Sequence, residues 1–341
     1  MRAVGYARPG GLEVLELLDL PEPHPGPGEV RVRVALSGVN PTDWKSRSGT
    51  PHMPIPDGRH QVPHQDGAGT IDEVGESVDA GRVGQRVWVW LAAYRRLTGT
   101  AQELALVPAV LAEPLPDDVS FEVGADLGVP FLTAHRALTV VEGGPTRLAA
   151  GALAGRSVLV AGGAGAVGNA AIQLARWAGA QVITTVSGAE KGELARAAAA
   201  HHVVDYRRQD VATEVRRIVP EGVSTVVEVS PTQNAAIDAA VLAPHGTVAI
   251  YANNGGDEAS LPIRPLMTVN ARIQYVLLYT MPEAAKTDAV AGVSAALRSG
   301  AIRVGEDAGL PLHRYRLADV GRAQQAVQDG VVGKVLVDPS T

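Results

Sequence analysis

The stretch "SVLVAGGAGAVGNAAIQLARWAGAQVITTVSGAEK", residues 157–191, decides the fold of this chain. It is typical of a strand, a glycine-rich turn, a helix closed by glycine, and a second strand. The pattern Gly163-x-Gly165-x-x-Gly168 lies between the first strand and the helix, which is the setting that gives the spacing its meaning. The stretch therefore predicts a βαβ unit whose helix N-terminus faces a pyrophosphate.

Each glycine of the turn has a predicted role. Gly163 permits the tight turn, Gly165 lets the backbone approach the pyrophosphate, and Gly168 lets the helix pack against the strand. The alternative is a tight turn that holds no ligand. The complete βαβ setting favours the dinucleotide site.

The residues after the second strand indicate which dinucleotide binds. An NAD site places Asp or Glu about 20 residues beyond the turn, at the end of that strand, to hold the ribose. This chain has Ser187 there, and a short hydroxyl leaves room for a 2′-phosphate. The sequence therefore favours NADPH, and the side chains expected to contact its 2′-phosphate are Ser187, Lys191 and Tyr206, with Arg207 or Arg208 as possible additions.

Two alternatives to this phosphate pocket remain open. Lys and Arg side chains are most often solvated surface charges without a ligand. Glu190 would reach a ribose if its loop ran differently.

The rest of the chain divides into a strand-rich part and a part with alternating strands and helices. "GEVRVRVALSGV" alternates Val with Arg and predicts a half-buried strand, and further short apolar runs bounded by glycine precede residue 128. From Gly128 onward strands and helices alternate. The predicted fold class is α/β with a doubly wound parallel sheet.

Composition excludes several classes of protein. The 341 residues carry a net charge of −6 with no long basic run, which argues against nucleic acid as a partner. The absence of cysteine excludes disulfides and thiolate chemistry. No apolar run reaches 18 residues, so we expect no membrane span and a cytoplasmic protein. The hydrolase pattern Gly-x-Ser-x-Gly is absent. The pattern Tyr-x-x-x-Lys of short-chain dehydrogenases is absent as well.

Four motifs occur in a characteristic order: "SGVNPTDWKSRSGT" (37–50), "VPHQDGAGTIDEVGESV" (62–78), "LGVPFLTAHRAL" (127–138) and "VLVAGGAGAVGNAAIQLA" (158–175), with "VGKVLVDP" (332–339) at the end. Together they resemble the zinc-free quinone oxidoreductase (zeta-crystallin-like) branch of the medium-chain dehydrogenase/reductase superfamily. The resemblance implies a GroES-like β-barrel domain of residues 1–127 and 281–341, and a Rossmann NADP(H)-binding domain of residues 128–280. It also implies a cofactor cleft between the two.

The resemblance also implies roles for particular residues. Asn40 and Thr133 would face the nicotinamide, and the backbone of Gly165, Ala166 and Val167 would hold the pyrophosphate. The residues expected to line the crevice at the strand ends are Ser230, Tyr251 and Asn253, with Lys334 approaching from the terminal strand.

The resemblance further implies that no metal is bound. Zinc alcohol dehydrogenases carry Cys where this chain has Asn40 and His where it has Gln65. A remaining candidate is the group of His52, His60 and His64, but Pro63 disfavours a helix that would align the last two. We therefore expect no metal site.

The proton donor and the substrate stay open. Related quinone reductases carry Tyr where this chain has Lys45, and related enoyl reductases carry a proton-donating Tyr where it has Pro51. Conceivable donors are Asp43, Lys45, His64 and Tyr279, and none is assigned. Loops 44–60 and 91–98 are expected to shape the substrate pocket, and Arg95 and Arg96 either contact an anionic substrate or form an exposed basic loop.

The predicted function is zinc-independent transfer of hydride from NADPH to a quinone or an α,β-unsaturated carbonyl. The alternative is a non-catalytic NADPH-binding protein with a structural or regulatory role. The apolar run "ARIQYVLLYT" (271–280) predicts an edge strand, and two such edges would join in a homodimer.

Overall fold

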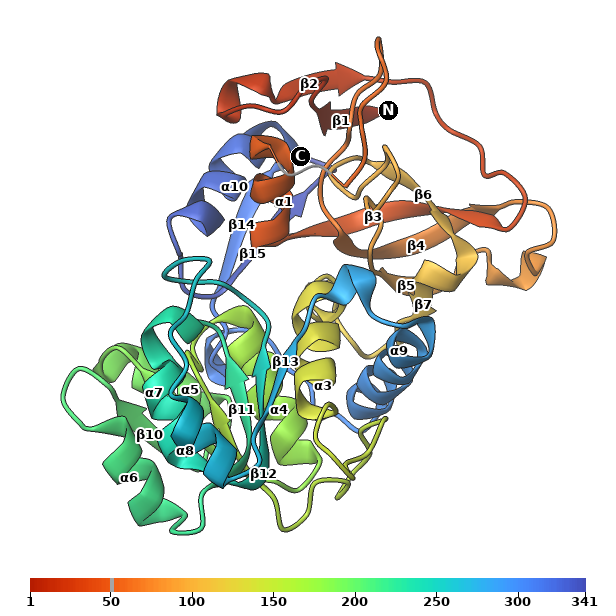
Figure 1. Ribbon diagram of the computed structural model, residues 1–341. Helices are drawn as coiled ribbons and strands as arrows, with labels where there is room; N and C mark the ends of the chain where they lie inside the picture. Colours follow the sequence, from red (N-terminus) through yellow and green to blue (C-terminus); the bar gives the residue numbers. More distant parts are fainter. Residues whose placement is uncertain (50–51) are drawn as a thin grey trace. The chain divides into compact units, whose positions relative to one another are not determined.

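The computed structural model describes residues 1–49 and 52–341. The chain forms two compact units (Figure 1). Unit 1 contains residues 1–129 and 312–341, and unit 2 contains residues 130–311.

Unit 2 contains a six-stranded parallel sheet with the order β10-β9-β8-β11-β12-β13. The order reverses between β8 and β11, so the crossovers run outward in both directions from this point, as in a doubly wound fold. The strands are β8 (Ser157–Val160), β9 (Gln181–Val186), β10 (His202–Asp205), β11 (Val223–Glu228), β12 (Leu242–Ile250) and β13 (Arg272–Tyr275).

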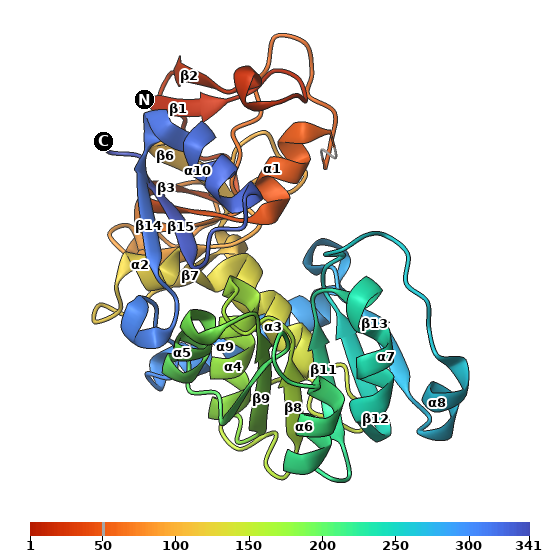
Figure 2. The same ribbon diagram turned by 90° about the vertical axis from the view of Figure 1, so that its left-hand side faces the viewer.

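Helices cover both faces of this sheet. Helix α3 packs against α4 and α9, while α6 packs against α7 (Figure 2). The opposed crossovers place the two groups on opposite faces because each βαβ connection is right-handed. The helical segments are η4 (Leu127–Phe131, a π-helix that spans the boundary with unit 1), α3 (Leu132–Leu138), α4 (Ala166–Trp177), α5 (Ala189–Ala197), α6 (Val211–Ile218), α7 (Pro231–Val241), α8 (Ile263–Thr268), η5 (Leu278–Thr280), α9 (Glu283–Arg298) and η6 (Glu306–Ala308).

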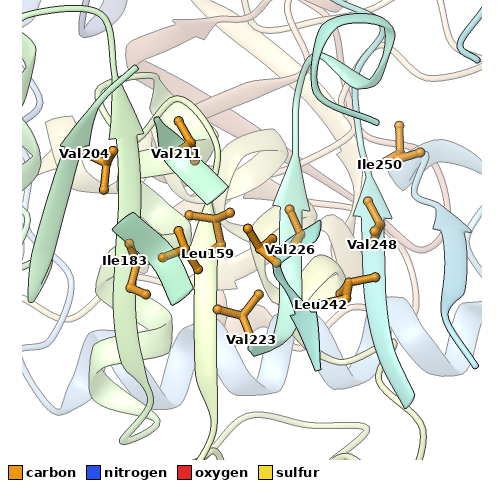
Figure 3. Packing of buried hydrophobic residues seen from close by; sticks show 11 residues of the cluster. Leu159, Ile183, Val204, Val211, Val223, Val226, Leu242, Val248 and Ile250 are labelled. Atoms are coloured by element: carbon orange, nitrogen blue, oxygen red, sulfur yellow. The ribbon is translucent and has the colours of Figure 1, made fainter. Parts of the chain in front are cut away.

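The core of unit 2 is apolar on both sides of the sheet. Leu159, Ile183 and Val226 come from three neighbouring strands and pack into one cluster with Val211 of α6 (Figure 3). Strands buried on both faces are rich in branched aliphatic residues because neither face meets water. This explains why the sequence runs "SVLV" and "STVVE" instead of alternating.

Unit 1 contains a mostly antiparallel sheet with the order β14-β15-β3-β4-β5-β7, and β6 pairs with β3 as well. A separate two-stranded sheet joins β1 to β2. The strands are β1 (Arg2–Gly5), β2 (Glu16–Asp19), β3 (Glu29–Val39), β4 (Asp66–Val74), β5 (Arg86–Val89), β6 (Leu104–Pro108), β7 (Ala112–Pro114), β14 (Leu312–Arg316) and β15 (Lys334–Asp338). The helical segments are α1 (Pro41–Ser48), α2 (Phe121–Gly124), α10 (Val320–Gln328) and the short turns η1 (Leu12–Val14), η2 (Ala80–Arg82), η3 (Ala109–Leu111) and η7 (Leu317–Asp319).

The units divide the chain differently from the domain boundaries expected from the sequence. We expected residues 281–341 to belong to the first domain, but residues 281–311 lie in unit 2. The reason is α9, whose buried face packs on α3 and α4. The other boundary, expected after residue 127, falls after residue 129.

Within residues 1–49 and 52–341, none of the helices combines the length and the apolar character that a membrane crossing requires.

Candidate functional site

The glycine-rich turn of unit 2 owes its shape to close contacts. A Cβ on Gly163 would lie 2.1 Å from Thr184 Oγ1, and a Cβ on Gly168 would lie 2.3 Å from the carbonyl oxygen of Gly162. The left-handed residue of the turn is Gly162, with φ of 70°. The sequence interpretation of Gly163 as the residue that permits the turn is therefore corrected: Gly163 permits β9 to approach, and Gly162 makes the turn.

The middle glycine of the turn faces open space. A Cβ on Gly165 would meet only the Gly162 carbonyl oxygen, at 3.5 Å. Gly165 is the N-cap of α4, and the first helical hydrogen bond runs from the Asn169 N–H to the Gly165 carbonyl oxygen (2.8 Å). The N–H groups of Ala166 and Val167 precede that bond and have no intrahelical partner. The turn thus offers backbone donors and room, which fits a pyrophosphate.

The residues predicted to contact a 2′-phosphate gather at the carboxyl ends of β9 and β10. Ser187 follows β9 directly, and the Tyr206 N–H donates to the Val186 carbonyl oxygen (3.1 Å), which brings the segment after β10 beside it. Lys191 lies in the first turn of α5, and the Tyr206 side chain is 52% exposed. The structure therefore brings Ser187, Lys191 and Tyr206 to one edge of the sheet.

The two neighbouring arginines differ in how they are engaged. Arg208 lies 3.8 Å from the Asp205 carboxylate, while the backbone N–H of Arg207 donates to Asp205 Oδ1 (3.1 Å). Glu190 is exposed on the first turn of α5. Among the described residues, no carboxylate lies within 4 Å of the Lys191 ammonium, so its charge is not neutralised by the protein there.

Ser230, Tyr251 and Asn253 lie at the carboxyl ends of β11 and β12. Ser230 Oγ donates to the Asn254 carbonyl oxygen (2.7 Å), and the Tyr251 N–H donates to the Glu228 carbonyl oxygen (3.0 Å). Tyr251 and Asn253 line a pocket that extends to edge strand β13. Asn253 Nδ2 donates to Asp257 Oδ1.

A buried acid beneath this crevice was missed by the sequence analysis. Glu228, at the end of β11, is fully buried and accepts hydrogen bonds from the Ser230 N–H and from Asn234 Nδ2 (3.0 Å). Burial raises the pKa of Glu228, and burial beside Glu228 raises the pKa of Asp238 well above its usual value. The signal in the sequence is the acid at the end of the apolar run "STVVE".

Unit 1 contains a buried ionic cluster that we call the lysine cluster: Asn40, Asp66, Asp126 and Lys334. Lys334 Nζ donates to Asn40 Oδ1 (3.0 Å) and lies 3.3 Å from Asp126 and 3.9 Å from Asp66. Asn40 Nδ2 donates to Asp66 Oδ2 (2.7 Å), which also accepts from the Val129 N–H (2.8 Å). Lys334 is 1% exposed and Asn40 2% exposed, so both are held inside unit 1.

Burial shifts the acids of this region towards their neutral forms. Burial raises the pKa of Asp66 to about 6 and that of Asp126 to about 7, although Lys334 opposes both shifts. Burial raises the pKa of Asp43 to about 8, and the Asp66 charge adds to that shift. One lysine, Lys334, faces several carboxyl groups here. The cost of burying the carboxylate charges therefore outweighs their attraction to this lysine.

The candidate proton donors lie in different surroundings. Asp43 accepts from the Asn40 N–H (2.7 Å) and lines a narrow pocket with room for about one water molecule. His64 lines the same pocket, but burial lowers its pKa to about 3, so its ring is neutral. Lys45 lies 5.8 Å from the centre of the Trp44 ring, and Tyr279 is buried in unit 2.

The predicted substrate loops are only partly described. Pro51, where related enoyl reductases carry a tyrosine, lies outside the described residues. Arg96 Nε donates to the carbonyl oxygen of Ala92 (2.9 Å), so this guanidinium is tied to its own loop. Arg95 is exposed and lies 5.3 Å from the centre of the Tyr94 ring. Thr133, the other predicted nicotinamide neighbour, is buried in α3 of unit 2.

The histidines that were weighed as a metal site have separate partners. His64 Nδ1 lies 2.8 Å from Ser37 Oγ, and His60 Nε2 lies 3.9 Å from Glu16. In the part of the chain that the structure describes, no three His, Asp or Glu side chains are grouped as metal ligands.

The mainly antiparallel sheet of unit 1 and the dinucleotide-type sheet of unit 2 define the class of medium-chain dehydrogenases/reductases. Two family models match the chain: "Alcohol dehydrogenase GroES-like domain" over residues 26–117 and "Zinc-binding dehydrogenase" over residues 166–294. The second name is that of the family model and assigns no metal to this chain. The resemblance described above implies that Asn40 and Gln65 replace zinc ligands.

Individual proteins place the chain more narrowly. A quinone oxidoreductase of Lama guanicoe is 32% identical, over 99% of this chain and 97% of that protein. The structure of a mycobacterial quinone oxidoreductase matches with a TM-score of 0.82 at 32% identity, over 99% of this chain and 100% of that one. A mycobacterial protein complexed with NADPH matches with a TM-score of 0.80, also at 32% identity and the same coverage. The chain belongs to the zinc-free quinone oxidoreductase branch of the medium-chain dehydrogenase/reductase superfamily, which confirms the predicted family and fold class.

Proposed function

We propose that this chain is an NADPH-dependent oxidoreductase that reduces a quinone or the conjugated double bond of an α,β-unsaturated carbonyl. The observation that carries the proposal is the open turn at Gly165 together with Ser187 directly after β9 and Lys191 in the first turn of α5. The relatives named quinone oxidoreductase, and the similar structure complexed with NADPH, support the same activity and cofactor. NADPH supplies the hydride.

The backbone of Gly165, Ala166 and Val167 would hold the pyrophosphate at the N-terminus of α4, where the helix dipole favours negative charge. Ser187, Lys191 and Tyr206 would hold the 2′-phosphate. A hydrogen bond to a charged group contributes about 1.5–3 kcal/mol, so the Lys191 contact alone would separate NADPH from NADH by roughly ten- to hundredfold.

The residues proposed for the nicotinamide end are Asn40 and Thr133, and those for the crevice at the strand ends are Ser230, Tyr251 and Asn253. The lysine cluster limits the hydrogen bonds that the Asn40 amide can form with a cofactor. Asn40 Oδ1 already accepts from Lys334, and one Nδ2 hydrogen is donated to Asp66. We infer that Lys334 acts on the cofactor site through Asn40, whose amide it orients. The proton for the reduced acceptor comes from water in this proposal.

A homodimer through β13 is part of the proposal. Among residues 1–49 and 52–341, strand β13 pairs with β12 alone, and Tyr275 and Leu277 at this edge are 72% and 56% exposed. Two such edges would pair across a twofold axis and bury these side chains. Light scattering that gives the monomer mass at micromolar concentration would contradict the dimer. A cytoplasmic location and a small-molecule substrate complete the proposal.

The test of the proposed function is steady-state oxidation of NADPH with a panel of quinones and enones. We expect turnover with at least one class of acceptor, and turnover that survives treatment with EDTA because no metal takes part. Tight NADPH binding without turnover of any acceptor would favour the alternative of a structural or regulatory protein. Activity lost in EDTA and restored by zinc would contradict metal independence.

A further inference from the structure

A second polar pocket of unit 2 lies at the amino ends of the strands, where β8, β9 and β10 begin. It has a volume of about 310 Å³. We call it the amino-end pocket, and its polar lining residues are Arg156, Ser157, Arg176, Gln181 and His201. The glycine-rich turn follows the other end of β8, so the two sites lie at opposite edges of one sheet.

Positive charge in the amino-end pocket is not matched by nearby acids. Among the described residues, no carboxylate lies within 4 Å of the guanidinium of Arg156 or of Arg176. Arg156 Nη2 donates to the Gly143 carbonyl oxygen at 3.4 Å, a long contact. Glu142, the acid next to Gly143 in the chain, is committed to Arg272 at 2.6 Å. Two guanidinium groups therefore face the pocket without a counter-ion.

His201 is the third polar side chain of the pocket. The Val182 N–H donates to His201 Nδ1 (2.9 Å), and Arg176 Nη1 lies against Nε2 of the same ring. Both ring nitrogens therefore face N–H groups. Burial lowers the pKa of His201, and the positive charge of Arg176 and the neighbouring His202 lowers it further. Two guanidinium groups and an imidazole thus line the pocket, and none of them supplies negative charge.

The end of α4 does not offset this positive field with free carbonyl groups. The carbonyl oxygens of residues 174, 175 and 176 accept from the N–H groups of Ala178, Ala180 and Gly179. Those of residues 177 and 178 accept from the Gly151 and Leu153 N–H groups, at 3.4 and 2.7 Å. The orphan acceptors that make a helix C-terminus unfavourable to anions are therefore already occupied here.

We propose that the amino-end pocket binds a phosphate-bearing anion between Arg156, Arg176 and His201. Two planar guanidinium groups suit the oxygens of a phosphate, which accept paired hydrogen bonds. The volume is that of about ten water molecules, which exceeds one tetrahedral anion and leaves room for a small organic group beside Ser157 and Gln181. The site is separate from the proposed coenzyme contacts and involves no chemical change of the ligand.

The experiment titrates the full chain with inorganic phosphate and, separately, with glycerol 3-phosphate, at constant ionic strength set with chloride. Binding is followed by calorimetry and by the NMR signal of the His201 ring, which is assigned with His201→Gln. The variants are Arg156→Gln/Arg176→Gln at the amino-end pocket, Lys191→Ala at the coenzyme edge, and Arg217→Ala as a matched control. Arg217 is an exposed arginine of unit 2 that pairs with Glu214 in α6.

We expect saturable binding that shifts the His201 signal, persists in Lys191→Ala and Arg217→Ala, and weakens roughly tenfold or more in the double arginine variant. Circular dichroism checks that this variant is folded, and each single arginine variant should show part of the loss. Tighter binding of glycerol 3-phosphate than of phosphate would identify an organic phosphate as the ligand, and equal binding would identify the inorganic ion. The proposal is overturned if the double variant binds like wild type, if only Lys191→Ala loses binding, or if wild type shows no saturable change.

Discussion

A buried cluster of unit 2 and a buried cluster of unit 1 contain opposite kinds of side chain. In unit 2, Leu159, Ile183 and Val226 pack with other aliphatic residues (Figure 3). In the lysine cluster of unit 1, Asp66 and Lys334 are just as deeply buried, yet they are ionisable groups. Apolar burial is non-directional, whereas a buried charge is tolerated only with a partner in good geometry. The comparison teaches that the aliphatic cluster of unit 2 provides stability, while the lysine cluster of unit 1 trades stability for a fixed arrangement of polar groups.

The largest effect is expected when the lysine cluster loses its only cation. Lys334→Met leaves Asp66 and Asp126 buried without a counter-charge, and breaking a buried pair in this way costs about 3–5 kcal/mol. Thermal and urea unfolding measure the loss.

The control for this variant is Lys286→Met. Lys286 is also buried along its length, but its partner Glu283 is 85% exposed in the side chain. Its loss should cost less than about 1 kcal/mol. Equal unfolding curves for Lys334→Met and wild type would show that the cluster is not held by charge.

A comparable loss without any charge is expected in unit 2. Leu159→Ala removes methyl groups from the cluster of β8 and leaves a cavity, which costs about 2–5 kcal/mol. The loss of unfolding free energy should be the same at pH 5 and pH 8, because the substitution changes no group that titrates in this range. A pH-dependent loss would mean that the core of unit 2 also depends on ionised groups.

A smaller effect, and one that depends on pH, is expected for Asp126→Asn. The pKa of Asp126 is raised to about 7 in the folded protein, whereas in the unfolded chain this pKa is near its ordinary value. Between these two values the folded protein binds a proton that the unfolded chain has released. Its contribution to stability is therefore present below about pH 4 and lost as the pH rises through about 7. The asparagine side chain of Asp126→Asn does not ionise, so the variant does not undergo this loss. Its free energy of unfolding should therefore rise relative to that of wild type between pH 5 and pH 8. Parallel stability curves would contradict the raised pKa.

The centre of unit 2 and the position of Ser187 directly after β9 could be predicted from the sequence. Local patterns carry them: the glycine spacing, the continuous apolar strands, and Ser187 at a fixed distance from the turn. The role of Gly163 was wrong in detail, because its contact with Thr184 comes from the neighbouring strand and leaves no mark in the local sequence.

The lysine cluster could not be predicted in the same way. Asn40 and Lys334 were identified by resemblance as cofactor residues, but their hydrogen bond joins residues 294 positions apart. Asp66 and Asp126 look like ordinary loop or strand-end acids in the sequence, and only tertiary packing shows that they are buried. The acid in "HQDGAG", within an otherwise uncharged run, is the one available signal.

The most direct test of the account measures the preference between NADPH and NADH in wild type, Lys191→Ala and Ser187→Asp, by equilibrium binding and by kcat/KM. We predict that wild type prefers NADPH, and that Lys191→Ala weakens NADPH by roughly ten- to hundredfold while leaving NADH nearly unchanged. Ser187→Asp should move the preference towards NADH, because its carboxylate repels the 2′-phosphate and can hold the ribose. If wild type uses both cofactors equally and Lys191→Ala changes neither, the assignment of Ser187, Lys191 and Tyr206 to the 2′-phosphate is wrong and Glu190 becomes the residue to test.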